Sequence, residues 1–157
     1  MHEGEGSHRG QAIKGRGSTG WLPGRYAKTV AEKTDDGWHE RDREDESDSA
    51  PRTEVREEAA RSLIVRNSSP DIPFAQSVNP YRGCEHGCSY CFARPTHAYI
   101  DLSPGLDFET KIFAKTNAPE VLRRELAKPG YQVSPIALGV STDIYQPTER
   151  KLQLTRR

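Results

Sequence analysis

All three cysteines of this 157-residue chain lie within eight residues, at Cys84, Cys88 and Cys91. Their spacing is Cys-x3-Cys-x2-Cys, inside the string CEHGCSYC. Clustered thiols in a sequence without a secretory signal favour metal binding over a disulfide framework. Two kinds of metal site use such thiolates. One is an iron–sulfur cluster, and the other is a structural zinc site with three cysteines and a histidine.

A four-iron cluster usually takes four cysteines, so three thiolates leave one iron with an open coordination site. A small molecule with an amine and a carboxylate can chelate that iron, and S-adenosylmethionine carries both groups. Reductive cleavage of the bound molecule would give methionine and a 5′-deoxyadenosyl radical, which abstracts hydrogen from a substrate. In the zinc alternative, His86 or His97 is the fourth ligand. Zinc modules usually take ligand pairs from two separate loops, whereas all thiols here share one loop.

The motif Cys-x3-Cys-x-aromatic-Cys, with Tyr90 as the aromatic residue, resembles the signature of the radical S-adenosylmethionine superfamily. The longer string SPDIPFAQSVNPYRGCEHGCSYCFARPTHAYIDLSPGLDFETKIFAK, with TDIYQPTER downstream, is similar to a narrower group. That group comprises bacterial proteins related to spore photoproduct lyase, which are described as DNA repair photolyase-like. The resemblance covers roughly residues 62–157, and KGRG at residues 14–17 is weakly similar as well. The family's C-terminal half has no counterpart in the sequence.

The resemblance implies a role for several residues. Cys84, Cys88 and Cys91 would ligate a [4Fe-4S] cluster. Tyr90 would pack beside the cluster and the adenine of S-adenosylmethionine. The end of the second barrel strand in such enzymes helps to hold the methionine amino group. In this sequence, that position is occupied by Ser141, Thr142 and Asp143. The resemblance also implies an electron donor of flavodoxin or ferredoxin type, and its family label suggests a DNA lesion as substrate.

Hydrophobic patterning predicts the elements that position these residues. Strands are expected at residues 61–65, 75–83, 108–115 and 135–142, and a short helix or turn at 92–100. The clearest helix follows Asn117, with Ala118, Val121, Leu122 and Leu126 on its apolar face. Asn117 is expected to cap this helix in a capping box with Glu120, and Pro129-Gly130 to end it. The apolar run 135–142 fits a buried parallel strand, and a further helix is expected to begin at Thr155.

This order of elements is a βα pattern with few units. Eight units close a barrel in about 250 residues, and a six-unit partial barrel would need roughly 190. We therefore expect an α/β fold in which residues 62–157 form the N-terminal part of a partial (βα) barrel of radical S-adenosylmethionine type. Such a barrel would be completed by further sequence or by another chain.

Residues 1–61 have a different composition. The first thirty residues contain seven glycines, and residues 31–61 carry twelve acidic against six basic residues. We expect this segment to be a disordered arm, because it has little apolar surface to offset chain entropy. Trp21, Tyr26 and Trp38 are candidates to fix the arm on a folded surface. No apolar run is long enough to span a membrane, and the expected location is the cytoplasm.

Two sets of basic residues have alternative interpretations. Arg82 and Arg94 either neutralise charge at the cluster or are ordinary surface arginines. A second set either contacts nucleic acid or begins a solvated helix, and it comprises Arg150, Lys151, Arg156 and Arg157. At the level of function, the alternatives to a radical enzyme are a non-catalytic zinc- or iron–sulfur-binding module and an inactive truncated fragment.

Overall fold

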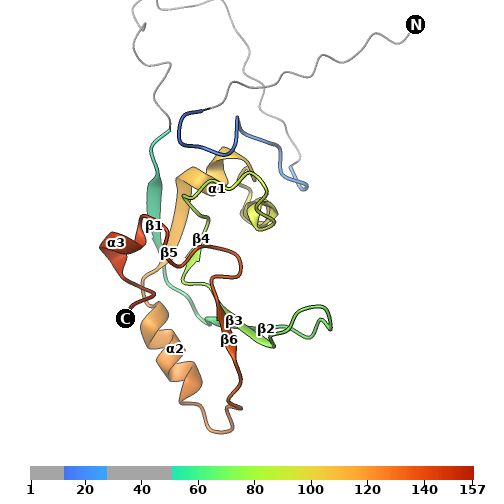
Figure 1. Ribbon diagram of the computed structural model, residues 1–157. Helices are drawn as coiled ribbons and strands as arrows, with labels where there is room; N and C mark the ends of the chain where they lie inside the picture. Colours follow the sequence, from blue (N-terminus) through green and yellow to red (C-terminus); the bar gives the residue numbers. More distant parts are fainter. Residues whose placement is uncertain (1–12, 28–50) are drawn as a thin grey trace, which may run out of the picture.

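The computed structural model describes residues 13–27 and 51–157. The described part is mixed α/β and contains two small sheets of three strands each. Figure 1 shows the blue N-terminal segment lying beside α1, and α2 at the opposite end of the molecule. The first sheet has the strand order β1-β5-β4, and the second has the order β2-β3-β6.

The central strand of the first sheet is β5 (Lys111–Lys115), in which buried Ile112 and Ala114 alternate with partly exposed residues. It pairs in parallel with β1 (Glu54–Glu58) and antiparallel with β4 (Tyr81–Arg82). This alternation is the burial pattern of a strand with one face on a core. The sheet therefore has a single apolar face, which β5 provides together with the tyrosine of β4.

The second sheet is built around β3 (Gln76–Val78), whose three residues are all buried. It pairs antiparallel with β2 (Ile64–Arg66) and in parallel with β6 (Ile136–Leu138). The sequence predicted one strand over residues 75–83. The structure instead has β3 and β4 in different sheets, separated by Asn79 and Pro80, because proline has no N–H for a ladder bond.

The longest helix, α2 (Ala118–Leu126), lies within the predicted range and follows Asn117 as expected. Its buried Val121 packs with Leu63 and Val78 in the core between α2 and the second sheet. The apolar face predicted for this helix is only partly buried, because Leu126 is 40% exposed. The helix therefore buries mainly its first two turns.

The N-terminus of α2 is held differently from the prediction. The Asn117 side chain makes no capping hydrogen bond to the helix. Its amide instead pairs with the backbone of Ala60, accepting from the Ala60 N–H at 2.8 Å and donating to the Ala60 carbonyl at 2.9 Å. The predicted capping box is therefore wrong, and Asn117 joins α2 to the chain between β1 and β2.

Shorter helices border the cysteine loop and the C-terminal segment. A 3₁₀ helix covers Arg94–Ile100, as the sequence predicted for that region. The helix α1 (Leu106–Thr110) is a single turn that leads directly into β5, where the sequence predicted continuous strand. The helix α3 is Glu149–Leu152, and Thr155 follows it rather than beginning a helix. The prediction for Thr155 was therefore wrong.

The expected disordered arm also needs correction. Strand β1 lies inside the range 1–61 and is ordered by its parallel pairing with β5. Residues 13–27 are described too, and Trp21 and Tyr26 contact the folded part as expected. The remaining predictions for residues 1–12 and 28–50, including Trp38, lie outside the described residues. Composition missed β1 because its side chains are mostly charged, and backbone pairing is what orders it.

The pairing of β6 with β3 is parallel, as predicted, but β6 is not buried, and Leu138 is 52% exposed. Neither sheet closes on itself within the described ranges. The partial barrel therefore stays a prediction. Among the described residues, no helix is both long and apolar enough to cross a membrane.

Candidate metal centre

The cysteine loop, residues 83–92, begins where β4 ends. Two of its glycines have backbone angles that favour glycine, with φ of +85° at Gly83 and +65° at Gly87. The Cys84 N–H donates to the Phe108 carbonyl at 3.0 Å, and the Cys91 N–H donates to the Cys88 carbonyl at 3.2 Å. These bonds hold the loop in a tight turn against α1.

The three thiols have different surroundings. Cys84 is buried and packs with Ala93 and Phe108, and the half-buried Cys91 packs against the same group. Cys88 lies exposed at the outer side of the loop. Two thiols thus border one small core, while the third faces outward.

Burial raises the pKa of the Cys84 thiol above its ordinary value. The nearby backbone N–H groups of His86 and Asp143 act in the opposite direction, because they favour the thiolate. Burial outweighs them, so the net effect favours the protonated thiol.

The segment that follows β6 reaches this loop. Thr142 is buried, and its hydroxyl donates to the Gly83 carbonyl at 2.6 Å. The backbone of Asp143 contacts Cys84, as described above, and its carboxylate lies 3.6 Å from His86 Nε2. Two of the three residues predicted to hold the methionine amino group thus meet the cysteine loop directly.

The third, Ser141, points its backbone N–H at the side chain of Asn79, at 2.9 Å. It joins the C-terminal end of β6 to the connection between β3 and β4. The hydroxyl of Ser141 makes no hydrogen bond within the described part of the chain. Ser141 is thus close in sequence to the site, but only its backbone is engaged.

Gln146 was missed by the sequence analysis. Its side chain is fully buried. It accepts from the Glu85 N–H at 3.2 Å, and it donates to Thr142 Oγ1 at 3.1 Å. One amide therefore cross-links the cysteine loop to the segment after β6. A lone glutamine in DIYQPTE carries no sequence signal for such a role.

Glu109 was also missed by the sequence analysis, and it pairs with Arg94 next to the loop. Glu109 is fully buried, and its carboxylate lies 2.5 Å from an Arg94 guanidinium nitrogen. Arg94 also donates to the Cys88 carbonyl, at 3.0 Å from Nε and 2.9 Å from Nη2. Its side chain is only 12% exposed, so the surface interpretation of Arg94 is wrong. Arg82, by contrast, is a partly exposed arginine 3.6 Å from Glu58.

Tyr90 does not pack beside the thiols. Its side chain is 89% exposed, as is most of the neighbouring Phe92. The expected contact of Tyr90 with a cofactor therefore stays a prediction, and the ring presents an open aromatic surface next to Cys91.

The two histidines considered as zinc ligands are placed differently. His86 is partly exposed and paired with Asp143. His97 is fully buried, with Nε2 3.1 Å from the Lys111 carbonyl and its ring edge against Phe108. Burial lowers the pKa of His97, which is therefore neutral. Its Nε2–H donates to the Lys111 carbonyl, so this ring nitrogen is not free to bind a metal.

Three thiolates in one glycine-containing loop are the donor set that iron–sulfur clusters use. Within residues 13–27 and 51–157, no three His, Cys, Asp or Glu side chains converge as a metal-holding group. The three thiols match the donor type that a cluster needs, and a cluster held by Cys84, Cys88 and Cys91 stays a prediction.

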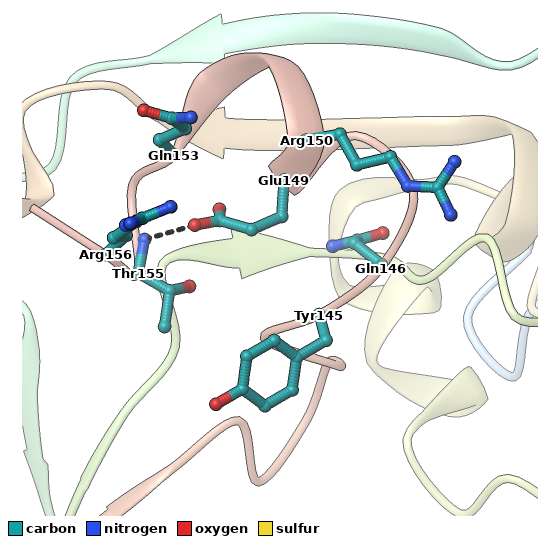
Figure 2. A pocket seen from close by; sticks show the side chains of 7 residues that line it. All are labelled: Tyr145, Gln146, Glu149, Arg150, Gln153, Thr155 and Arg156. Carbon is teal, nitrogen blue, oxygen red and sulfur yellow. Dashed lines mark hydrogen bonds between the residues drawn. The ribbon is translucent and has the colours of Figure 1, made fainter.

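A pocket of about 560 Å³ lies next to this site (Figure 2). Gln146 lines it and also contacts the cysteine loop, and Figure 2 shows the Tyr145 ring on the side away from α3. Arg150 and Arg156 supply two guanidinium groups, which suit a carboxylate or phosphate. The pocket size lies in the range of small-molecule sites. Its lining residues are Tyr145, Gln146, Glu149, Arg150, Gln153, Thr155 and Arg156.

The chain is similar to proteins of two mycobacteria and of an archaeon that are named as uncharacterized. An uncharacterized protein of Mycobacterium tuberculosis is 52% identical over 83 residues, which are 53% of this chain and 24% of the relative. An uncharacterized protein of Mycobacterium bovis matches to the same extent. An uncharacterized protein of Methanocaldococcus jannaschii is 29% identical over 86 residues, which are 54% of this chain and 30% of the relative.

The chain spans about a quarter of the length of the mycobacterial relatives that it matches. No family model matches the sequence, and no solved structure gives a significant match.

Proposed function

We propose that the chain is a radical S-adenosylmethionine protein, in which Cys84, Cys88 and Cys91 hold a [4Fe-4S] cluster. When bound, such a cluster supplies an electron that cleaves S-adenosylmethionine to a hydrogen-abstracting radical. The proposal includes a cytoplasmic location, where thiols stay reduced, and an electron donor of flavodoxin or ferredoxin type.

One observation carries this proposal. The three thiols share a single loop, and the segment after β6 lies against that loop through Thr142 and Asp143. In α/β barrel enzymes, the residues that contact substrate or cofactor follow the C-terminal ends of the strands. The backbone N–H groups of His86 and Asp143 oppose the effect of burial on the pKa of Cys84, although burial is the larger effect. Backbone donors near ligand sulfurs are also a means of tuning a cluster's reduction potential.

The residues of the chain have separable tasks. Cys84, Cys88 and Cys91 would bind the cluster, and Thr142 would fix the start of their loop through Gly83. Asp143 would contact a cofactor amino group, and its partly exposed carboxylate beside the loop supports this role. Three protein ligands leave one iron open for that cofactor.

The substrate follows from the resemblance alone, and a DNA lesion is its candidate. The guanidinium groups of Arg150 and Arg156 at the neighbouring pocket suit phosphate groups. Binding of a single-stranded oligonucleotide should then weaken with rising salt, and it should weaken further in the doubly substituted chain Arg150→Gln, Arg156→Gln. If neither rising salt nor the double substitution weakens oligonucleotide binding, the proposal of a nucleic-acid substrate is contradicted.

Metal analysis after anaerobic reconstitution tests the cluster. We expect a brown protein with about four irons per chain. Zinc at about one per chain without iron would contradict the proposal and favour the structural zinc site. If iron binds but reductant and S-adenosylmethionine give no 5′-deoxyadenosine, the chain is a non-catalytic iron–sulfur module or an inactive fragment.

A further inference from the structure

The segment 16–22 lies along the chain that carries α1, although more than eighty residues separate them in sequence (Figure 1). At one end, the Gly17 N–H donates to Glu109 Oε2 at 3.1 Å. At the other end, the Leu22 N–H donates to Ser103 Oγ at 2.7 Å. The segment is therefore attached at both ends by specific hydrogen bonds.

Contacts between these ends strengthen the attachment. The Gly20 carbonyl accepts from the Leu106 N–H at 3.1 Å. The Trp21 ring nitrogen donates to the Asp107 carboxylate at 3.0 Å. A string of polar contacts thus follows α1 and the turn before it.

Gly17 approaches the cysteine loop more closely than any side chain would permit. A Cβ atom at this position would lie 1.6 Å from the carbonyl oxygen of Gly87. Gly87 lies between Cys84 and Cys88 in the loop. Contact at this distance would be impossible for alanine, because heavy atoms of neighbouring groups do not approach within 3 Å of a Cβ. Glycine at position 17 therefore allows the segment to rest on the loop backbone.

The buried carboxylate of Glu109 joins this segment to the loop a second time. It accepts from Gly17 on one side and pairs with Arg94 on the other. Arg94 in turn donates twice to the Cys88 carbonyl. Movement of the segment would remove a hydrogen bond from the buried Glu109 carboxylate, and Arg94 links this carboxylate to the Cys88 carbonyl.

We propose that residues 16–22, here named the clasp, position the cysteine loop for metal binding, with Gly17 and Glu109 as the positioning residues. This inference rests on the proposed function in so far as the loop is the metal-binding loop. The clasp contacts the loop between the first two thiols and, through Arg94, at the second. A loop fixed in this way loses less conformational freedom when its thiols take up a metal.

The test is the alkylation rate of each cysteine in the reduced, metal-free, full-length chain, followed by mass spectrometry. In Gly17→Ala, the added methyl group forces the clasp off the loop. We expect the rates at Cys84 and Cys91 to rise at least about fivefold through local opening. Cys88 is already exposed, so its rate should change less than about twofold.

Gly20→Ala is the matched control, because a Cβ at Gly20 meets nothing within 4 Å and the carbonyl that binds Leu106 is retained. The alkylation rate of each cysteine in Gly20→Ala should equal that in the unsubstituted chain. Glu109→Gln is a second variant that keeps the volume of the carboxylate and removes its charge. It should accelerate Cys84 and Cys91 in the same pattern.

Unchanged rates in both Gly17→Ala and Glu109→Gln would overturn the clasp. An equal rise at all three cysteines, with a lowered melting temperature, would overturn it as well, because it would indicate general destabilisation. Iron binding is scored separately. If the selective rise occurs and the unsubstituted chain binds no iron, the clasp stands and the proposed function fails. If Gly17→Ala labels selectively and also binds less iron than Gly20→Ala, both are supported.

Discussion

The ion pair of Arg94 with Glu109 is a buried pair of charges next to the cysteine loop. Both side chains are largely removed from water, and the guanidinium also binds the Cys88 carbonyl. A buried charge that loses its partner costs far more than an exposed one. At the scale of single residues, the loop therefore depends on groups that are not themselves metal ligands.

Replacing Arg94 by alanine should lower the free energy of unfolding by about 3–5 kcal/mol, because Glu109 would be left buried without a counter-charge. Replacing Arg82 by alanine should cost less than about 1 kcal/mol, since its contact with Glu58 is long and partly exposed. Denaturant titration of the two variants measures both values. Equal losses would show that the Arg94 pair is not a buried one in solution.

Serine in place of any one of Cys84, Cys88 or Cys91 should remove most of the iron bound after reconstitution, because each thiolate is a ligand in the proposed cluster. His86→Ala should retain it. The iron-to-protein ratio of the four variants is the measurement. Loss of metal in His86→Ala to the same degree as in the cysteine variants would indicate a site with three cysteines and one histidine.

The resemblance implied a shared site for the three thiols and residues 141–143, and of these residues Thr142 and Asp143 contact the cysteine loop. The sequence did not predict Glu109, Gln146 or Gly17 as neighbours of the loop. Each of these is defined by a partner distant in sequence, and the string FETKIFAK reads as a strand whether or not its glutamate is buried. Pairings of single buried polar groups depend on the tertiary fold, which periodicity does not encode.

At the scale of secondary-structure elements, Asn117 can stabilise the start of α2 either as a helix cap or through its bonds to the Ala60 backbone. A substitution at this residue separates the two roles. Asn117→Ser keeps a good capping residue but loses the two bonds to the Ala60 backbone. We expect it to lower the unfolding free energy by about 1–2 kcal/mol, from two lost hydrogen bonds. Chemical denaturation measures this loss. A stability equal to that of the unsubstituted chain would mean that Asn117 acts as a helix cap after all.

The carboxylate of Glu125 connects α2 to β2 and gives the fold a pH dependence. Burial tends to raise its pKa, but bonds from Ser62 Oγ and the N–H groups of Ile64 and Leu63 outweigh burial and lower it. A lowered pKa means that the ionised form stabilises the folded state above the unfolded pKa.

This contribution is lost as pH falls through the lower, folded-state pKa. Glu125→Ala should therefore be destabilised at pH 7 by about 1–2 kcal/mol, and its difference from the unsubstituted chain should shrink under acidic conditions. Thermal melts over a pH series measure the effect. A difference that stays constant down to acidic pH would contradict the assignment.

Apolar spacing in the sequence predicts α2 but not β1. The apolar spacing and the terminal Pro129-Gly130 predicted α2 almost to its ends. Strand β1 was assigned to the disordered arm, because Glu54–Glu58 has the composition of a solvated segment. Its order comes from parallel pairing with β5, whose partner residues are about sixty positions away in sequence.

At the scale of the whole molecule, two cores flank the stretch that runs through β3 and β4. One lies between α2 and the second sheet, and the other joins the first sheet to the segment after α3. The cysteine loop leaves the end of β4, where the clasp, α1 and the segment after β6 all meet it. Three parts of the chain that are distant from one another in sequence thus meet at the cysteine loop.

The central claim is that the loop holds a cluster with one iron open to S-adenosylmethionine. Its most direct test is the electron paramagnetic resonance spectrum of the anaerobically reconstituted and reduced chain, recorded before and after addition of S-adenosylmethionine. We predict a reduced four-iron signal that changes on addition, because the amine and carboxylate bind the open iron. An unchanged signal, or a chain that takes up zinc and no iron, would contradict the claim.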